Sequence, residues 1–222
     1  VLLMYSRGDL EGRNILILGD DDLTGIAAAL TGLPRSITVL DIDNRLVEFI
    51  DKTARKYGWG NLSVSVYDVR NPLPRALAGQ YDTFLTDPLE TRLGLTLFLS
   101  RGAEALKGST CSGYFGLTSL EASSRKWHYI QRLLLDMNFI IREVLTDFHS
   151  YVWNRSDPVE TAFPYLKKLG LSIPPPPLKW YKSSIFRIET IDTPKPVLTG
   201  ALTEGAEIYA DDEATSLEFG GR

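Results

Sequence analysis

The stretch Asn14-Ile15-Leu16-Ile17-Leu18-Gly19-Asp20-Asp21-Asp22-Leu23-Thr24-Gly25 decides the fold of this chain. Residues 14–18 form an apolar run that is typical of a buried strand, and residues 23–30 are typical of a helix. The three aspartates therefore occupy the first strand-to-helix turn of a βαβ unit, a turn that normally holds a ligand. A dinucleotide site has glycines there, whose amides receive a pyrophosphate. Three carboxylates would instead repel a phosphate and favour a ligand with a positive centre.

Strand-like and helix-like segments alternate along the chain, as they do in a parallel α/β sheet. After the first unit, this pattern predicts strands at residues 36–40, 62–67, 83–86 and 111–117, with helices at 44–57, 93–106 and 120–138. Two later strands, at 139–145 and 184–189, could pair antiparallel at the sheet edge. The sequence therefore predicts an α/β fold with a Rossmann-like, class I methyltransferase-type sheet. This sheet is mostly parallel with an antiparallel edge hairpin, and helices cover both faces.

The 222 residues are enough for one large domain, which we expect to span residues 1–190. Between its last two strands lies a run of four prolines, 174–177, which predicts a stiff loop near the active site. From Ile191 onward, Pro, Gly and acidic residues dominate, so a flexible acidic tail is expected over 191–222. Because the chain starts without Met and soon reaches its first strand, we also expect an N-terminal domain to be missing.

Composition narrows the classes of protein. Hydrophobic residues make up 44% of the chain and charged residues 23%, and no apolar run approaches the roughly 20 residues of a membrane helix. The formal net charge is −4 and Lys and Arg are scattered, which disfavours nucleic acid as a partner. Cys111 is the single cysteine, and His128 and His149 lie far apart in sequence, so no metal site is expected. We expect a cytoplasmic protein.

Acidic residues also follow the next three predicted strands, at the sheet edge where ligands bind in open α/β folds. Asp43 is explained as the N-cap of the next helix, which leaves Asp41 to accept both hydroxyls of a ribose. Asp68-Val69 suits an adenine, because the carboxylate can take the exocyclic amine. Asp87-Pro88 follows the fourth strand and can aim a carboxylate over the sheet edge, where an amine could be held.

Five motifs resemble those of one known family: Gly19-Asp20-Asp21-Asp22-Leu23-Thr24, Leu40-Asp41-Ile42-Asp43, Thr86-Asp87-Pro88-Leu89-Glu90-Thr91, Gly113-Tyr114-Phe115-Gly116 and Trp180-Tyr181-Lys182-Ser183. Over about residues 12–189 the chain is similar to the branched-chain polyamine synthases, the N4-bis(aminopropyl)spermidine synthases. The acidic turn is the most specific of these motifs. One departure is Leu89, which stands where the family would have a second proline. The family also carries an N-terminal domain ahead of this region.

The resemblance implies an aminopropyltransferase, which moves the aminopropyl group of decarboxylated S-adenosylmethionine to the secondary amine of spermidine and releases methylthioadenosine. Decarboxylated S-adenosylmethionine would be a co-substrate, and no tightly bound cofactor is expected. The catalytic residues would be Asp20, Asp21 and Asp22, with Asp21 or Asp22 as the base. Donor binding would fall to Gly19, Asp41, Asp68 and Val69, and acceptor binding to Asp87, Pro88, Glu90 and Thr91.

Two other functions stay open from the sequence. An S-adenosylmethionine-dependent methyltransferase acting on an amine or base has the same scaffold, although the Leu89-Glu90 pair offers no aromatic ring to stack on a base. A non-catalytic module that binds a polyamine or nucleoside is the second. The acidic tail could close over the polyamine or be a solvated terminus; its acids are Glu204, Glu207, Asp211, Asp212 and Glu213. The oligomeric state, with a homodimer as one arrangement, is also open.

Overall fold

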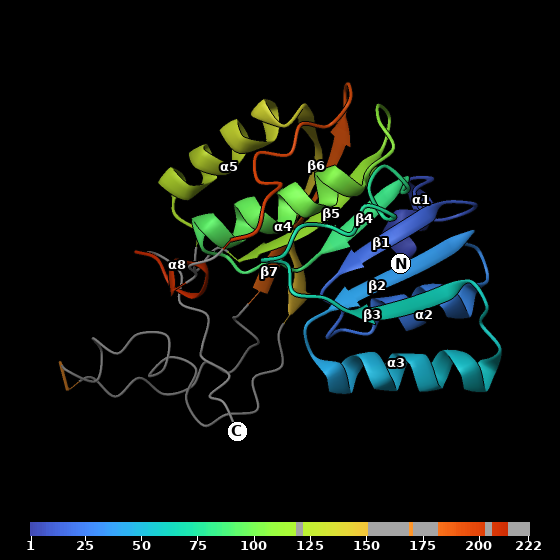
Figure 1. Ribbon diagram of the computed structural model, residues 1–222. Helices are drawn as coiled ribbons and strands as arrows, with labels where there is room; N and C mark the ends of the chain where they lie inside the picture. The colour runs from blue at the N-terminus through green and yellow to red at the C-terminus, as the bar shows by residue number, and fades with distance from the viewer. Residues whose placement is uncertain (119–121, 151–168, 171–181, 203–205, 213–222) are drawn as a thin grey trace.

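A computed structural model describes residues 1–118, 122–150, 169–170, 182–202 and 206–212, and Figure 1 shows its architecture. Its centre is a seven-stranded sheet with the strand order β3-β2-β1-β4-β5-β7-β6. The strands are β1 (Asn14–Leu18), β2 (Ser36–Asp41), β3 (Leu62–Val66), β4 (Thr83–Thr86), β5 (Ser112–Thr118), β6 (Phe139–Ser150) and β7 (Lys182–Thr190). The first five strands pair in parallel, whereas β7 is antiparallel to both β5 and β6.

Helices pack on both faces of this sheet (Figure 1). On one face lie α2 (Thr24–Thr31) and α3 (Asn44–Tyr57), and on the other lie α4 (Arg92–Ala105) and α5 (Ser124–Asp136). Two short helices complete the described chain, α1 (Leu2–Ser6) and α8 (Ala206–Tyr209). On the α4 and α5 face, the rings of Phe115 and Phe186 stack with centroids 4.7 Å apart in the apolar core. No helix in the described ranges is long and apolar enough to cross a membrane.

The class of fold predicted from the sequence is confirmed. Several elements match closely: α3 begins and ends at the predicted residues, and so do β1 and β4. The edge hairpin also forms, with β6 at the edge and β7 between β5 and β6. The other elements differ from the predicted ranges by a few residues at their ends, and the largest difference is that β6 continues to Ser150 instead of ending at residue 145. Its pairing with β7 supplies the main-chain hydrogen bonds that extend it, and residue periodicity does not report such pairing.

Strand order places the acidic turn at the topological switch point of the sheet. β1 pairs with β2 on one side and with β4 on the other, so the chain leaves β1 in one direction and returns to its other side later. In open α/β sheets, ligands bind in the crevice beyond the carboxyl ends of the strands at this point. The turn after β1 and the loop after β4 therefore flank one crevice.

The segment after β7, where the sequence predicts a flexible tail, makes backbone hydrogen bonds with the domain. The amides of Ile191 and Lys195 donate to the carbonyls of Asn138 and Met137 at 3.0 Å and 3.1 Å, and the amide of Leu202 donates to the carbonyl of Arg70 at 2.9 Å. Residues 191–202 are thus connected to segments distant in sequence. Backbone groups supply these contacts, and the composition of the segment does not report them.

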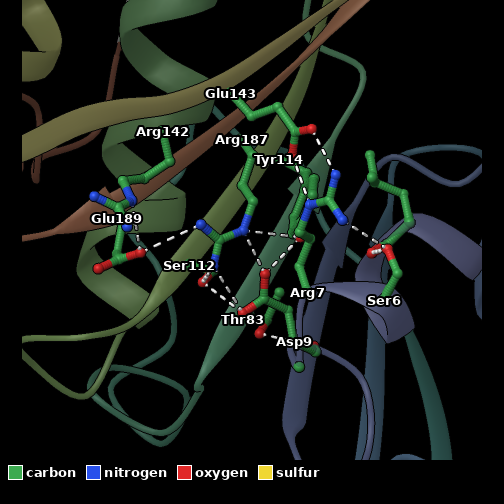
Figure 2. Close-up of polar contacts among 12 residues, drawn as sticks. Ser6, Arg7, Asp9, Thr83, Ser112, Tyr114, Arg142, Glu143, Arg187 and Glu189 are labelled. Atoms are coloured by element: carbon green, nitrogen blue, oxygen red, sulfur yellow. Dashed lines mark hydrogen bonds and ion pairs between the residues drawn. The ribbon is translucent and has the colours of Figure 1, made fainter.

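A buried ionic network, drawn in Figure 2, holds the amino-terminal segment against the sheet. It contacts Thr83 and Ser112, the first residues of β4 and β5, and so lies at the end of these strands opposite the acidic turn. The guanidinium of Arg187 on β7 donates to the carboxylate of Asp9 at 2.7 Å, and the hydroxyls of Ser112 and Tyr114 on β5 donate to the same carboxylate. Hydrogen bonds and the charge of Asp9 raise the pKa of Arg187. Because each of these polar groups has a partner, the network joins the segment before β1 to both β5 and β7 without leaving a bare buried charge.

Candidate active site

The acidic turn has a backbone shape that few residues adopt. Gly19 has φ of 75° and Leu23 has φ of 57°, and Leu23 is not a glycine. A left-handed residue with a Cβ costs free energy and is found most often at functional sites. The two residues bracket the aspartates, so the turn presents them between β1 and α2.

A pocket opens beside this turn at the carboxyl ends of the central strands. Its lining comes from the acidic turn, the end of β4 and one residue each of β5, β6 and β7: Gly19, Asp20, Asp21, Asp22, Thr24, Leu85, Thr86, Asp87, Gly116, His149 and Ile185. Four of these side chains are aspartates, so the pocket favours cationic ligands. Among the residues that the structure describes, no group of three or more His, Cys, Asp or Glu is arranged to hold a metal ion.

Asp20 differs from its two neighbours because it is buried. Only 2% of its surface is exposed, and its Oδ2 accepts a hydrogen bond of 2.9 Å from the amide of Gly25 in α2. A Cβ on Gly25 would lie 2.6 Å from Val39 Cγ2 and 2.8 Å from Asp20 Oδ2. Gly25 therefore allows the helix to sit directly on this carboxylate. Burial raises the pKa of Asp20 to about 7.

Asp21 and Asp22 are exposed in the pocket lining. Partial desolvation raises the pKa of Asp21, and the negative charges of Asp22 and Asp41 raise it further. A carboxylate that is disfavoured in its charged form accepts a proton more readily than an ordinary surface aspartate. All three aspartates line the pocket, and the structure separates them into one buried residue that supports the turn and two exposed ones.

The raised pKa of Asp20 predicts a specific dependence of stability on pH. Between about pH 4 and pH 7 the folded protein keeps a proton on Asp20 that the unfolded chain has released, so the free energy of unfolding falls as pH rises through that window. The slope from this residue is at most about 1.4 kcal/mol per pH unit, and it vanishes above the folded-state pKa. Urea unfolding of the wild type and Asp20→Asn at several pH values measures how the free energy of unfolding depends on pH.

The amide variant cannot titrate, so the difference between the two unfolding free energies isolates the contribution of Asp20. That difference should change between about pH 4 and pH 7 and then stay level. Asp136→Asn on the exposed surface of α5 is the control, and its profile should run parallel to that of the wild type. Parallel profiles for Asp20→Asn as well would contradict the assignment of the raised pKa.

Asp41 lies at the end of β2, directly beside the acidic turn. Its Oδ2 accepts from the amide of Asp20 at 2.9 Å, and its Oδ1 accepts from the amide of Asp43 at 2.8 Å. Each oxygen keeps a further lone pair for a ligand hydroxyl. Asp43 is the N-cap of α3, as predicted, and its hydrogen bonds with Arg45 hold its pKa at about 2. Asp41, a predicted donor-binding residue, thus holds the backbone of the acidic turn in place.

Asp68 has a cationic partner that sequence reasoning missed. Arg70 donates from its side chain to both carboxylate oxygens, and these hydrogen bonds lower the pKa of Asp68. The neighbouring carbonyl of Val69 accepts at 3.0 Å from Arg101, whose side chain is fully buried in α4. Arg101 also donates to the carbonyls of Leu198 and Gly200. One buried cation therefore joins the loop after β3 to the segment that follows β7.

The loop after β4 aims Asp87 across the sheet onto β5. A Cβ on Gly116 would lie 2.5 Å from Asp87 Oδ1, so the carboxylate rests on the bare backbone of that glycine. Pro88 is buried behind it. Asp87 and the acidic turn line the same pocket, as expected from their positions after neighbouring strands.

Glu90 and Thr91 make structural contacts within the same loop. The carboxylate of Glu90 accepts from the amide of Thr118 at 2.7 Å and from its hydroxyl at 2.8 Å. Thr91 is the N-cap of α4 and donates its hydroxyl to the carbonyl of Ile208 at 2.8 Å. These contacts fix the loop that carries Asp87, and neither residue is among those that line the pocket. Sequence reasoning grouped them with Asp87 because motif spacing does not report which way a side chain points.

His149 is a pocket residue that sequence reasoning did not include among the site residues. It lies near the end of β6, beyond the predicted strand, and approaches the acidic turn only because β6 and β7 pair at that edge. The four prolines at 174–177 and the motif residues Trp180 and Tyr181 lie outside the described residues, as do Glu204 and Glu213. Of the acidic tail, Asp211 accepts from the amide of Arg92 at 2.8 Å, and so it lies at the start of α4.

The strand order with one antiparallel strand, together with a pocket at the first strand-to-helix turn, defines a class I methyltransferase-like α/β protein. The N-methyltransferase NodS of Bradyrhizobium japonicum has this fold, with a TM-score of 0.54, 14% identity and coverage of 86% of this chain and 92% of that one. The branched-chain polyamine synthase A C-terminal domain family matches residues 1–216. The chain belongs to that family.

Several relatives agree with this assignment. N(4)-bis(aminopropyl)spermidine synthase of Thermococcus kodakarensis is 43% identical over 218 residues, which are 97% of this chain and 60% of the relative. The crystal structure of the branched-chain polyamine synthase from Thermus thermophilus, in complex with N4-aminopropylspermidine and 5′-methylthioadenosine, superposes with a TM-score of 0.85. It is 42% identical, with coverage of 97% of this chain and 60% of that one. The chain thus spans about three fifths of these relatives.

Proposed function

We propose that this chain is an aminopropyltransferase, which moves the aminopropyl group of decarboxylated S-adenosylmethionine to the secondary amine of spermidine. The products would be a branched polyamine and methylthioadenosine. The anionic pocket at the switch point carries this proposal, because Asp20, Asp21, Asp22 and Asp87 all line it. The Thermus relative, whose structure holds N4-aminopropylspermidine and 5′-methylthioadenosine, supports it further.

The chemistry of aminopropyl transfer requires carboxylates. The lone pair of a neutral amine attacks the carbon next to the sulfonium, an N–C bond forms, and the C–S bond breaks with its electron pair going to sulfur. The donor becomes a neutral thioether, and the new ammonium loses its proton to a base. Aspartates in this pocket would offset the two cations that must approach each other, and one would accept the proton. Because Asp21 and Asp22 are exposed to the pocket, they are the proposed base candidates, and Asp20 supports them.

The other site residues divide into two groups in this proposal. Gly19, Asp41, Asp68 and Val69 would bind the donor nucleoside, since they lie at or just after the carboxyl ends of β1, β2 and β3, at one edge of the sheet. Asp87 would hold the acceptor amine, with Pro88, Glu90 and Thr91 shaping its loop. As a cytoplasmic enzyme the protein would act on small molecules rather than on nucleic acid. A homodimer is the assembly to test, and light scattering in solution measures it.

One assay tests the proposed function directly. The protein is incubated with decarboxylated S-adenosylmethionine and spermidine, and chromatography follows methylthioadenosine together with the branched product. Release of methylthioadenosine that depends on spermidine is the expected result. A protein that binds both compounds and releases nothing would be a binding module instead.

Donor selectivity separates the synthase from a methyltransferase. The carboxylate of S-adenosylmethionine would meet the acidic turn, whereas the decarboxylated donor has none. At an effective dielectric of about 20 and a separation of about 5 Å, one like-charged pair costs roughly 3 kcal/mol before salt and relaxation reduce it. We therefore expect methylthioadenosine and the decarboxylated donor to bind more tightly than S-adenosylhomocysteine and S-adenosylmethionine. Calorimetric titration of the four compounds measures the difference.

The difference in affinity between compounds without and with the carboxylate should shrink in Asp21→Asn or Asp22→Asn, since each substitution removes one repelling charge. Asp136→Asn, an exposed aspartate on α5, leaves the turn unchanged and should preserve it. Tighter binding of the two compounds that carry a carboxylate would point to the methyltransferase.

A further inference from the structure

The end of β6 is irregular beside the pocket. Leu145 pairs with Ile185 and His149 pairs with Ser183, so four residues of β6 correspond to two of β7. Asp147 lies within this bulge with φ of 53°, and its carboxylate lies 3.2 Å from the ammonium of Lys182. Bulges next to active sites commonly redirect a side chain. Here the bulge brings His149 into the pocket lining.

Ser183, the partner of His149 on β7, has an unsatisfied hydroxyl. Its side chain is buried, with 1% of the residue exposed, and among the described residues its Oγ has no hydrogen-bond partner. Leaving a buried hydroxyl without a partner costs free energy, so such a group in a native protein calls for a ligand, water or another reason. The mechanism described above does not use this hydroxyl.

Register places this hydroxyl on the pocket side of the sheet. Ser183 stands opposite both Thr118 on β5 and His149 on β6, and directly opposed residues project to the same face. Two residues along β7, Ile185 stands opposite Gly116, and these two line the pocket. Residues two apart on a strand share a face and lie about 7 Å apart. Ser183 therefore lies two residues along β7 from Ile185, which stands opposite the glycine that Asp87 contacts.

We propose that Ser183 Oγ and the imidazole of His149 form an amine-binding subsite, which accepts hydrogen bonds from an acceptor nitrogen next to the one that is attacked. This inference rests on the proposed function. The step of about 7 Å along the strand suits a propylene or butylene spacer between two amines. Four aspartates draw the polycation into the pocket without choosing a nitrogen, because charge attraction is not directional. The subsite supplies the directional contacts, and so it sets which nitrogen reaches the donor.

The test measures spermidine binding without turnover. Spermidine is titrated calorimetrically into the protein saturated with methylthioadenosine, for the wild type, Ser183→Ala and His149→Ala. Each variant should bind spermidine roughly 10-fold more weakly, the loss expected for a hydrogen bond to a charged group, while affinity for methylthioadenosine stays unchanged. His149 is exposed, so its variant folds even if Ser183→Ala were to disturb the strand.

Matched controls come from the same residue types elsewhere. His128→Ala on the exposed surface of α5 and Ser109→Ala in the loop before β5 should bind spermidine as the wild type does. Butylamine, which has a single amine, should lose little affinity in Ser183→Ala and His149→Ala, because the acidic turn can hold that amine without the subsite. Equal loss for butylamine and spermidine would contradict the subsite.

The outcomes separate the two proposals. If the wild type binds spermidine and releases methylthioadenosine, while both subsite variants bind spermidine as tightly as the controls, the subsite is wrong and the proposed function stands. If the wild type neither binds spermidine nor transfers an aminopropyl group to it, the proposed function is wrong and the subsite is wrong with it.

Discussion

Asp21→Asn and Asp22→Asn should fold normally, and at least one of them should turn over roughly 100-fold or more slowly, the size of effect expected for a lost general base. Asparagine keeps the shape of the side chain and removes its ability to accept a proton. Both residues are exposed in the pocket, so neither substitution leaves a buried group without a partner. Steady-state release of methylthioadenosine, measured at saturating donor and spermidine, gives the rates.

The buried member of the trio calls for a different expectation. Asp20 caps α2 through the amide of Gly25, and the carbonyl oxygen of an asparagine could take over this role. Asp20→Asn therefore tests whether this residue supports the turn. It should change the dependence of stability on pH, and it should lower turnover less than the loss of the general base does. Asp136→Asn on α5 is the surface control for all three variants. Full activity in all three turn variants would contradict the assignment of the catalytic turn.

Gly116→Ala should lower kcat/KM for spermidine by roughly 10- to 100-fold, because a small misplacement of a positioning group is costly in catalysis. The new Cβ would lie 2.5 Å from Asp87 Oδ1, so the carboxylate must leave its place over β5. A side chain can rotate away more easily than a backbone can move, so the loss of stability should stay modest. Initial rates at varied spermidine concentrations, together with thermal unfolding, measure both effects.

Two other glycines provide matched comparisons. Gly60→Ala adds a Cβ where no atom lies within 4 Å, and it should leave activity unchanged. At Gly113 the new Cβ would lie 2.4 Å from the ring of Phe84, so this variant should lose about 1 to 3 kcal/mol of stability through overpacking. A Gly116→Ala variant that keeps wild-type kcat/KM would show that Asp87 does not need its present position.

Features that depend only on residues close together in the sequence could be predicted, and features that depend on distant residues could not. The turn of residues 19–22 could be located because an apolar strand precedes it and a helix follows, and both patterns are read within a few residues. Asp43 could be assigned as an N-cap for the same reason, since its partner is the amide of Arg45. The residue at which β6 ends could not be predicted in this way, because it depends on pairing with a strand more than thirty residues later.

Buried cations mark the second limit of sequence reasoning. Arg101 lies fully buried in a helix that reads as an ordinary apolar crossover, and besides Glu104 in the same helix its partners are the carbonyls of Val69, Leu198 and Gly200. Main-chain carbonyls are present at every residue, so no sequence pattern distinguishes the ones that a cation will find. The segment after β7 was predicted to be flexible from its Pro, Gly and acidic residues, and this composition does not report the backbone contacts between the segment and the domain.

The sequence by itself determined the α/β fold, the place of the acidic turn and the family, because these depend on strand and helix periodicity and on short motifs. Only the tertiary structure decided that Asp20 is buried while Asp21 and Asp22 are exposed, and that Asp87 rests on Gly116. Burial and direction arise where segments distant in sequence pack together. Three adjacent carboxylates with the same chemistry therefore differ in burial, and burial raises the pKa of Asp20 to about 7.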